Sequence, residues 1–562
     1  MRTPLSLIRY RRAGGLLALA AVLCAAGAGP AAASPAAASP SPAAASPSPA
    51  AASPSPSPAA ASPAAGSSSP AAGSGSWTVY HGDPAGTGVA GPVRAVKVAG
   101  RVWTSPTLDG TTYGEPLVYA GHIYVATEND TVYALSAATG TVAWSAHLAS
   151  PVPAGDLPCG DISPTVGITG TPVIDPSRNE IFVVADELVN GSPVKWLVGL
   201  DTATGRVEMR ASVDPPGADN AALLQRTGLT LDAGQVVFGM AGNDGDCATY
   251  RGRVVAVPET GGTPRFFTVD AALGENQGGI WMGGAAPVVD GAGHVWVSTG
   301  NGSVYSYAHA YDDSDSVLEL SAAMRLVQYF APSEWAANNS RDLDMSIAPA
   351  LLPDGQVLLT GKSRIMYLLD GAHLGGIGHQ QATAATTCGD DIDGGVAVVG
   401  MTVYLPCLSG IIAVQARKSP PGLHVLWSSG IGGGPPIVAA GLVWTMGQNG
   451  TLYGLDPATG KVRQQAAVGT PANHFPTPSV ADGLLLAAAA RYVVAFAAPA
   501  PGAAAATPVP GPAPGSGAAD TAAPTSGHAV PGRGLAALAF GALIIIIAVF
   551  WVLSRRRGGG AG

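Results

Sequence analysis

Residues 133–144, YALSAATGTVAW, recur in altered form at two distant points of the chain. Residues 198–209 read VGLDTATGRVEM, and residues 453–464 read YGLDPATGKVRQ. Each copy consists of an apolar run, a polar turn that ends in Thr-Gly, and a second run that contains apolar residues. Gly supplies the positive-φ position of a tight turn and the Asp or Thr side chain hydrogen-bonds the turn backbone, so each copy predicts a β-hairpin. A hairpin repeated at such distances indicates that one small unit was copied and stacked.

Looser copies of the same unit fill residues 77–497 at roughly fifty residues each, a length that suits four short strands. The apolar second strands of these copies are HIYVAT (122–127), EIFVVA (180–185), QVVFGM (235–240), HVWVST (294–299), QVLLTG (356–361), TVYLPC (402–407), LVWTMG (442–447) and LLLAAA (484–489). The sequence therefore predicts an all-β, eight-bladed β-propeller, with seven blades as the alternative if one degenerate copy is an insertion. Residues 101–108, RVWTSPTL, have no partner of their own and are expected to complete the last blade. A short helix is expected within residues 333–344.

The repeated hairpin resembles the tryptophan-docking motif A-x-D-x-x-T-G-x-x-x-W of quinoprotein-like propellers, the family of pyrroloquinoline quinone (PQQ) alcohol dehydrogenases and their non-catalytic relatives. The positions that match this motif are Ala134, Thr139, Gly140 and Trp144 in the first copy, Asp201, Thr204 and Gly205 in the second, and Asp456, Thr459 and Gly460 in the third. Ser136 replaces the first Asp, and Met209 and Gln464 replace two of the tryptophans. The resemblance implies that these residues dock one blade on the next, which identifies a fold and leaves the chemistry open.

Three glycine-rich loops resemble the polyvinyl-alcohol-dehydrogenase-like branch of this family. They are residues 158–161 (PCGD), 167–172 (GITGTP) and 279–284 (GIWMGG). Glycines at these points also let backbones approach one another near a channel axis, so the loops have a structural explanation as well as a cofactor-binding one.

Both ends of the chain carry the composition of targeting segments. Residues 1–33 combine arginines, an apolar run and Ala-Ala-Ala before Ser34, which is typical of a secretory signal peptide. Residues 34–76 and 498–533 are rich in Ala, Pro and Ser or Gly and are expected to be a disordered linker and a stalk. Residues 534–553 are twenty uncharged residues, long enough for a transmembrane helix.

Arginines in the tail 554–562 place the C-terminus in the cytoplasm by the positive-inside rule. The expected protein is a single-pass plasma-membrane protein with an extracellular propeller. The net charge of −9 disfavours nucleic acid as a partner.

Four cysteines remain after removal of the predicted signal peptide: Cys159, Cys247, Cys388 and Cys407. An even number in an exported domain favours disulfides. Three pairings exist, and Cys159–Cys247 with Cys388–Cys407 is expected because each pair joins loops of the same or neighbouring blades. A metal site is the alternative, which the lack of any C-x-x-C spacing disfavours.

One mouth of the propeller channel can be read from the repeat, because the starts of first strands and the ends of second strands meet at the same face. The first-strand starts contribute Tyr113, Glu115, Arg226, Trp281, Asp391, Asp393, His474 and Phe475. The second-strand ends contribute Glu128, Asp130, Asp186, Glu187, Asp244, Asp246, Lys362, Arg364, Gln448 and Asn449. Nine acids and three bases in this set predict an acidic mouth. The alternative is that these residues are ordinary solvated turn residues.

The resemblance implies specific candidates for a PQQ site. A planar tricarboxylate cofactor needs cations or Ca²⁺ with oxygen ligands, an aromatic floor and a carboxylate base. Lys362 and Arg364 are the candidates to face the quinone, Trp281 is the candidate floor, and Asp393 or Asp186 the candidate base. No residue is assigned to a metal. The acidic loop at residues 311–316 lacks the ligand spacing of an EF-hand and is expected to be a solvated loop.

Two departures count against a quinone enzyme. The vicinal Cys-Cys pair of many quinoprotein alcohol dehydrogenases is absent, and so is any C-x-x-C-H haem-attachment motif. The favoured hypothesis is therefore a non-catalytic binding scaffold, without an assigned cofactor, for an envelope protein or a cell-wall ligand. The alternative is a PQQ- and calcium-dependent dehydrogenase that oxidises alcohol or sugar groups.

Overall fold

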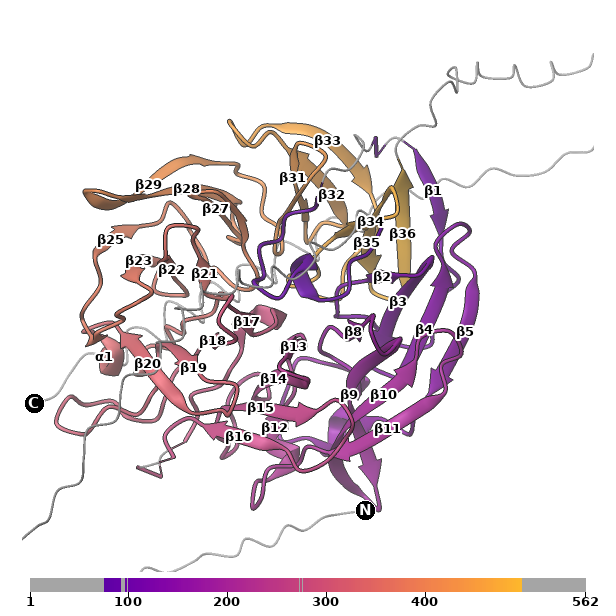
Figure 1. Cartoon of the computed structure of the whole chain (residues 1–562), viewed down its shortest axis with the longest axis horizontal. Coiled ribbons are helices and arrows are strands. Elements are labelled where there is room, and N and C mark those ends of the chain that lie inside the picture. Colours follow the sequence, from indigo (N-terminus) through magenta and orange to yellow (C-terminus); the bar gives the residue numbers. More distant parts are fainter. Residues whose placement is uncertain (1–74, 92–96, 99, 272, 275, 498–562) are drawn as a thin grey trace, which may run out of the picture. The chain divides into compact units, whose positions relative to one another are not determined.

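Eight antiparallel sheets stand around a common axis in the computed structural model, which describes residues 75–91, 97–98, 100–271, 273–274 and 276–497 (Figure 1). The first four blades are β2–β5 (Leu117–Tyr119, His122–Thr127, Thr131–Ser136, Val142–His147), β8–β11 (Val173–Asp175, Glu180–Val189, Ser192–Asp201, Val207–Ser212), β13–β16 (Thr230–Asp232, Gln235–Gly242, Arg253–Pro258, Arg265–Thr268) and β17–β20 (Val288–Val289, Val295–Ser298, Val317–Leu320, Leu326–Ala331). The predicted eight-bladed propeller is confirmed, and each second strand lies where the repeat places it.

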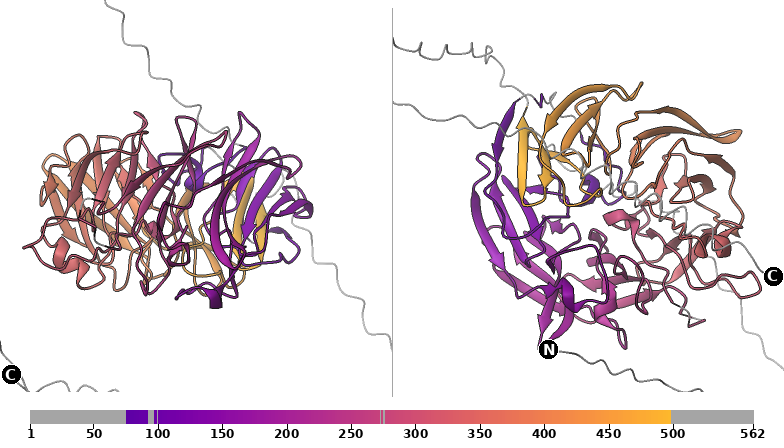
Figure 2. Two further views of the ribbon diagram at one scale, coloured as in Figure 1. Left: turned by 90° about the horizontal axis from the view of Figure 1, so that it is seen from below. Right: turned by 180° about the vertical axis from the view of Figure 1, so that it is seen from behind.

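The remaining blades complete the ring, which Figure 2 shows from the side and from behind. They are β21–β23 with β25 (Ala350–Leu351, Gln356–Leu359, Ile365–Asp370, Ala382–Ala385), β26–β29 (Ala397–Val399, Thr402–Leu405, Ile412–Lys418, Pro421–Ser428), β30–β33 (Ile437–Ala439, Leu442–Met446, Thr451–Leu455, Val462–Ala467) and β34–β36 with β1 (Ser479–Ala481, Leu484–Ala489, Tyr492–Ala497, Arg101–Thr104). The smaller elements are β12 (Leu223–Leu224) against β14, β24 (Gly376–Ile377) beside β20, the hairpin β6–β7 (Val152–Pro153, Thr165–Val166), and α1 (Trp335–Asn339).

The ring closes by pairing the two ends of the propeller. β1 runs antiparallel to β36, with Trp103 opposite Ala495 and Thr104 opposite Val494. Arg491, at the start of β36, donates through its guanidinium to the Leu108 carbonyl. The expectation that residues 101–108 complete the last blade is confirmed, and so is the short helix α1 within residues 333–344.

Indole rings join neighbouring blades at the repeated hairpin. Trp144 Nε1 donates to the carbonyl of Thr202 in the next blade at 2.9 Å, and its ring fills the space where Gly205 lacks a Cβ. Trp103 and Trp427 repeat this arrangement over Gly140 and Gly460, and neither tryptophan was identified from the sequence. The docking role predicted for the motif is therefore confirmed.

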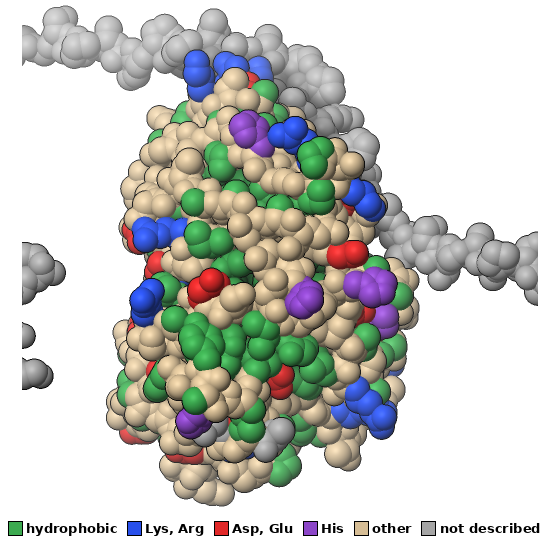
Figure 3. Space-filling view, turned by 90° about the vertical axis from the view of Figure 1, so that its left-hand side faces the viewer, with side chains coloured by type: hydrophobic (Ala, Val, Ile, Leu, Met, Phe, Trp, Pro, Cys, Tyr) green, Lys and Arg blue, Asp and Glu red, His purple; other side chains and the backbone are tan. Residues whose placement is uncertain are grey.

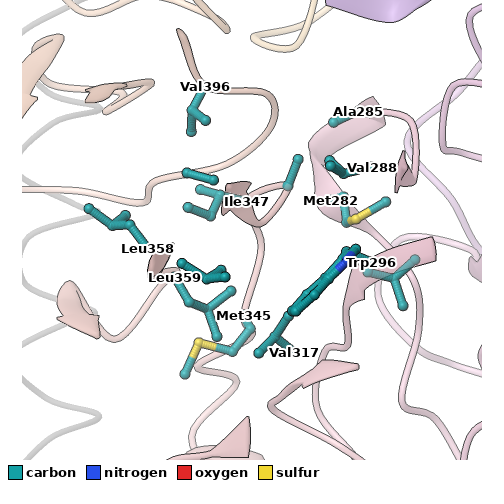
Figure 4. Close-up of a cluster of buried hydrophobic side chains, with 14 of the residues drawn as sticks. Met282, Ala285, Val288, Trp296, Val317, Met345, Ile347, Leu358, Leu359 and Val396 are labelled. Carbon is teal, nitrogen blue, oxygen red and sulfur yellow. The ribbon is translucent and has the colours of Figure 1, made fainter. Parts of the chain in front are cut away.

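The core consists of the apolar side chains that interleave between adjacent blades. Figure 4 shows part of the largest cluster, in which Trp296 lies among Val288, Val317 and Met345. These side chains are 0–4% exposed. Burial of this kind between sheets, repeated around the ring, is the main stabilising contribution of the fold.

Residues 77–89 cross the ring axis before the first blade begins (Figure 1). Trp77 pairs with Val118 of β2, and Val89 pairs with Val438 of β30, so this segment spans from the first blade to the seventh. The one-turn helix η1 (Tyr80–Gly82) lies between these contacts. We call residues 77–89 the axial plug.

The expected signal peptide (1–33), nearly all of the linker (34–76), the stalk (498–533), the transmembrane helix (534–553) and the tail (554–562) lie outside the described residues. Within the described part of the chain, no helix has the length and apolar character needed to cross a membrane.

Candidate functional site

A cavity of about 470 Å³ opens at the centre of the ring on the predicted face. Its lining includes Asp161, Leu224, Arg226, Asp244, Gly245, Asp246, Gln277, Trp281, Gly283, Asn301, Tyr305, Asn339, Asp342, Asp344, Ser346, Lys362, Asp391, Asp393, His474 and Phe475. Nine of these were predicted from the repeat. The volume lies in the range of small-molecule sites.

Trp281 reaches the cavity from the loop before η4 (Met282–Gly284). Gly300 makes room for this residue, because a Cβ there would meet Cδ1 of the Trp281 indole at 2.9 Å and would also collide with the Asp344 carboxylate. A single glycine therefore allows the aromatic ring and the acid to approach the same point of the wall.

Lys362 follows β22 and lies among carboxylates. Its Nζ is 2.5 Å from Asp344 Oδ2 and 3.1 Å from Asp342 Oδ1. Burial lowers the pKa of Lys362, but the two carboxylates outweigh burial and raise that pKa above its ordinary value. Burial likewise raises the pKa of Asp344, against the opposing effect of Lys362. The lysine is thus charged and held in place by Asp344.

Asn301 brings an unsatisfied oxygen to the same wall. Its backbone N–H donates to Asp344 Oδ1 at 2.7 Å and its Nδ2 donates to Asp342 Oδ1 at 2.6 Å, while its buried Oδ1 has no hydrogen-bond partner. Asp246 is fixed nearby by the Tyr250 hydroxyl at 2.6 Å, and burial raises the pKa of Asp246. Carboxylate and amide oxygens are the ligands that Ca²⁺ prefers. Asn301, Asp344 and Asp246 are therefore the residues that fit a hard divalent cation.

Arg226 is the second permanent cation that lines the cavity. The Arg226 guanidinium carbon lies 4.3 Å from the centre of the Phe475 ring and 5.5 Å from that of Tyr113. Burial lowers the pKa of Arg226, which is 5% exposed. On the same side, His474 Nε2 lies 3.7 Å from Asp393 Oδ2, so Asp393 lines the cavity as predicted.

Both predicted disulfides are present and both fix loops of the cavity rim. Cys159–Cys247 connects the loop of Asp161 to the loop of Asp244–Asp246. Cys388–Cys407 closes the loop that carries Asp391 and Asp393, and Ile392 pairs with Cys407 by a β-bridge. The rim carboxylates are thus held on covalently closed loops.

Several predicted site residues lie elsewhere. Asp186, a candidate base, does not line the cavity: β9 continues past it to Val189, and its carboxylate pairs with the buried Lys195 at 2.7 Å. Arg364 is exposed at a positive φ, donates to the Gly389 carbonyl and is not among the residues that line the cavity. Glu115 does not line the cavity; its carboxylate accepts hydrogen bonds from Trp77 and His81 of the axial plug. The predictions of a base at Asp186 and a quinone contact at Arg364 are corrected accordingly.

Other predicted mouth residues are covered or point outward. Glu128 is buried and accepts from the Gly167 N–H at 2.7 Å, because the hairpin β6–β7 lies over this end of the first blade. Asp130 and Glu187 are buried beside it. Gln448 and Asn449 are exposed turn residues. The loop at residues 311–316 is also not solvated, since Asp312, Ser314, Asp315 and Ser316 are 0–1% exposed.

Sequence reasoning missed Asp161, Asn301, Asp342 and Asp344 as lining residues. Asn301 follows the second strand β18, the position used to find the others, so the repeat itself could have identified it. Asp342 and Asp344 precede β21 after the α1 segment, an insertion that breaks the spacing of the repeat.

The cavity is strongly acidic. Among the described residues that line it, seven are aspartates and two, Arg226 and Lys362, are permanent cations. By contrast, charged side chains of both signs are scattered over the outer wall seen in Figure 3. The concentration of acids in the cavity is therefore not seen on this side of the outer wall.

Comparison with known proteins gives the same fold. The family model described as "Outer membrane protein assembly factor BamB" matches residues 64–314. Polyvinylalcohol dehydrogenase of Sphingopyxis sp. (strain 113P3) is 27% identical over 438 residues, which cover 65% of this chain and 62% of that relative. The match thus spans less than two thirds of the relative's length.

Solved structures agree on the architecture. The quinohemoprotein alcohol dehydrogenase ADHIIG from Pseudomonas putida HK5 matches with a TM-score of 0.57 and 14% identity over 75% of this chain and 80% of that one. The quinohemoprotein alcohol dehydrogenase from Comamonas testosteroni matches with a TM-score of 0.56 and 15% identity over 76% and 81%. At these identities the likeness shows the fold alone. The chain is thus an eight-bladed β-propeller that is similar to quinoprotein-like propellers, and its sequence is similar to that of a polyvinylalcohol dehydrogenase.

Proposed function

We propose that the propeller is a PQQ- and divalent-cation-dependent dehydrogenase that oxidises alcohol groups. The observation that carries this proposal is the cavity wall in which Trp281, Lys362, Asp344 and the unsatisfied Asn301 Oδ1 converge. This reverses the preference for a non-catalytic scaffold that the sequence alone suggested.

The donor set fits the cofactor only together with a cation. A tricarboxylate brought near seven aspartates is repelled, since two unit charges 4 Å apart still interact by about 1 kcal/mol in bulk water. A Ca²⁺ held by Asn301 Oδ1 and Asp246 would offset that repulsion. The pocket therefore supports cofactor binding that depends on Ca²⁺.

Each residue of the wall then has a role. Trp281 offers a flat ring for a planar cofactor to stack on, and Lys362 donates a charged hydrogen bond to a carbonyl oxygen beside it. PQQ, when bound, supplies a two-electron acceptor. We place the proton-accepting role on Asp344, because it lies beside Lys362 in the cavity wall and its pKa is raised by burial. Asp393, the base predicted from sequence, also lines the cavity and is the second candidate.

The proposed substrate class, alcohol groups, is supported by the name of one relative, polyvinylalcohol dehydrogenase. The chain has no C-x-x-C-H haem motif, so electrons leave to an external acceptor. We further propose that the protein works outside the plasma membrane, held by residues 534–553. Protease added to intact cells should then release the propeller, and full protection until lysis would contradict this location.

The test is reconstitution of the purified protein with PQQ and Ca²⁺. We expect one quinone absorbance per chain that requires Ca²⁺, and reduction of an artificial dye when primary or secondary alcohols are added. Asp344→Asn should abolish turnover. If Asp344→Asn retains turnover and Asp393→Asn loses it while both bind the quinone, the base is Asp393. Absence of quinone binding at saturating Ca²⁺ would overturn the proposal.

A non-catalytic scaffold for an envelope partner is the second candidate. The family model that matches residues 64–314, described as an outer membrane assembly factor, favours it. In that case the same reconstitution yields no bound quinone, and the Lys362 wall serves to contact a partner protein.

A further inference from the structure

A second cluster of ligand-type side chains lies at the turn between β17 and β18, residues 290–294. His294 Nδ1 is 2.6 Å from Glu319 Oε1 and 3.5 Å from Asp290 Oδ2. The ligand atoms of Asp290, His294 and Glu319 all lie within 4.8 Å of one another. Turns between first and second strands lie at the opposite strand ends from the cavity, so this cluster is on the other face of the ring.

The carboxylates of this cluster are fixed from behind by neutral donors. Trp296 Nε1 donates to Asp290 Oδ2 at 3.0 Å, and the backbone N–H groups of Ala292 and His294 donate to Asp290 Oδ1. Gln328 Nε2 donates to Glu319 Oε2 at 2.5 Å, which leaves Oε1 facing His294. Gln328 is itself fixed, because its Oε1 accepts from the Leu374 N–H at 2.8 Å. Such outer partners orient the ligands of protein metal sites.

The neighbouring blade adds an unsatisfied acid. Asp232, at the end of β13, is 8% exposed, and its Oδ2 is buried with no hydrogen-bond partner. Its Oδ1 lies 3.3 Å from the position that a Cβ would take at Gly293, the residue before His294. Burial raises the pKa of Asp232, the Asp290 charge raises it further, and His294 lowers it. Asp232 therefore faces the same turn from the third blade.

The charges around this turn are unbalanced. Among the described residues, His294 is the one basic side chain at ion-pair distance from Asp290 or Glu319, and Asp232 forms no ion pair. Three carboxylates and one imidazole thus leave excess negative charge even when the imidazole is protonated. A buried carboxylate oxygen without a partner is costly, and a bound cation removes that cost.

We propose that Asp290, His294 and Glu319 bind a divalent transition-metal ion of the Zn²⁺ class, with the Asp232 carboxylate of the third blade adding negative charge beside the turn. One imidazole nitrogen and carboxylate oxygens are ligands that Zn²⁺ accepts at about 2.0–2.2 Å. The ion takes the place of the proton between His294 Nδ1 and Glu319 Oε1. Because the cluster lies on the face opposite the cavity, the ion stabilises the ring and takes no part in quinone chemistry.

The test uses Co²⁺ as a spectroscopic probe on the full-length, metal-stripped chain. We expect one Co²⁺ per chain with visible d–d bands, displacement of those bands by Zn²⁺, and a melting temperature that rises with Zn²⁺. His294→Ala should abolish all three effects, and Gln328→Ala should weaken Co²⁺ binding about 10- to 100-fold.

Two controls test where the ion binds. His424→Ala removes an exposed histidine of β29 and should leave Co²⁺ binding unchanged, and excess Ca²⁺, which fills the proposed cation site of the cavity, should be present in every Co²⁺ titration. Melting of His294→Ala without metal shows whether that variant is folded. Failure of the wild-type chain to bind Co²⁺, or d–d bands that survive His294→Ala, would overturn the proposal.

Discussion

The two ends of the ring axis differ in whether their buried polar groups have partners within the protein. At the plugged end, Glu115 accepts from Trp77 Nε1 at 3.0 Å and from the His81 N–H at 2.8 Å, so both carboxylate oxygens are satisfied. His81, which is 0% exposed, places Nδ1 3.0 Å from the Val396 carbonyl and stacks on Tyr80. At the open end, seven aspartates share two cations and Asn301 Oδ1 is left unsatisfied.

This difference distinguishes the axial plug, which has a structural role, from the cavity, which is the candidate site. Polar groups of the axial plug find their partners inside the protein, which is what a structural closure requires. Polar groups of the cavity are arranged toward a ligand that the chain does not supply. The small polar space between Glu115, Arg226 and Phe475 lies where the two ends meet.

The largest expected effect comes from breaking the plug. Trp77 is 2% exposed and donates to Glu115, so Trp77→Ala should lower the free energy of unfolding by about 3–5 kcal/mol. Urea denaturation at pH 7 measures this change. Tyr307→Ala, which truncates a side chain that is 58% exposed, is the control and should change stability by less than about 0.5 kcal/mol. A plug variant as stable as this control would show that residues 77–89 are not part of the closure.

Acidification should weaken the plug through His81. Burial lowers the pKa of His81 from 6.5 to about 4, so the unfolded chain takes up this proton first as the pH falls. Stability is therefore complete above pH 6.5 and is lost as the pH falls toward 4, by about 3 kcal/mol for this group. Glu115, whose pKa burial raises, acts in the opposite sense as pH rises above 4.5. Comparing the wild-type chain with His81→Gln at each pH isolates the histidine, and a pH-independent difference would contradict the prediction.

At the open end, removal of one cation should abolish cofactor binding with little change in fold. Lys362→Met should weaken quinone affinity at saturating Ca²⁺ at least about 100-fold, or about 2.7 kcal/mol. The measurement is a quinone titration followed by absorbance. An affinity for Lys362→Met within tenfold of wild type would mean that the quinone is held elsewhere.

The smallest effect is expected at Arg364, two residues further along the same turn. Its side chain is exposed and does not line the cavity, so Arg364→Met should change quinone affinity by less than about twofold, within the scatter of surface substitutions. Lys461→Met, at another exposed position, calibrates the titration. A large loss at Arg364 would restore the prediction made from sequence.

The fold was predictable because the repeat is local: the Thr-Gly hairpins, the second strands and even the closing strand β1 are visible in short runs of residues. The site was predictable only in part. Asp186 and Glu187 follow an apolar run of ordinary strand length, but β9 and β10 are ten residues each, and this extension carries both acids into a sheet where Lys195 and Arg210 pair with them. Asp344 depends on how an inserted segment folds back, which no local pattern encodes.

Ring closure by β1 and β36 also sets the order in which the protein can mature. Arg101–Thr104 is made early and Tyr492–Ala497 late, so the first of these strands waits unpaired for nearly four hundred residues of synthesis. During that interval its exposed edge is free to pair with other chains. A chain that stops before residue 492 lacks β36, so β1 has no strand to pair with and the pairing that closes the ring cannot form.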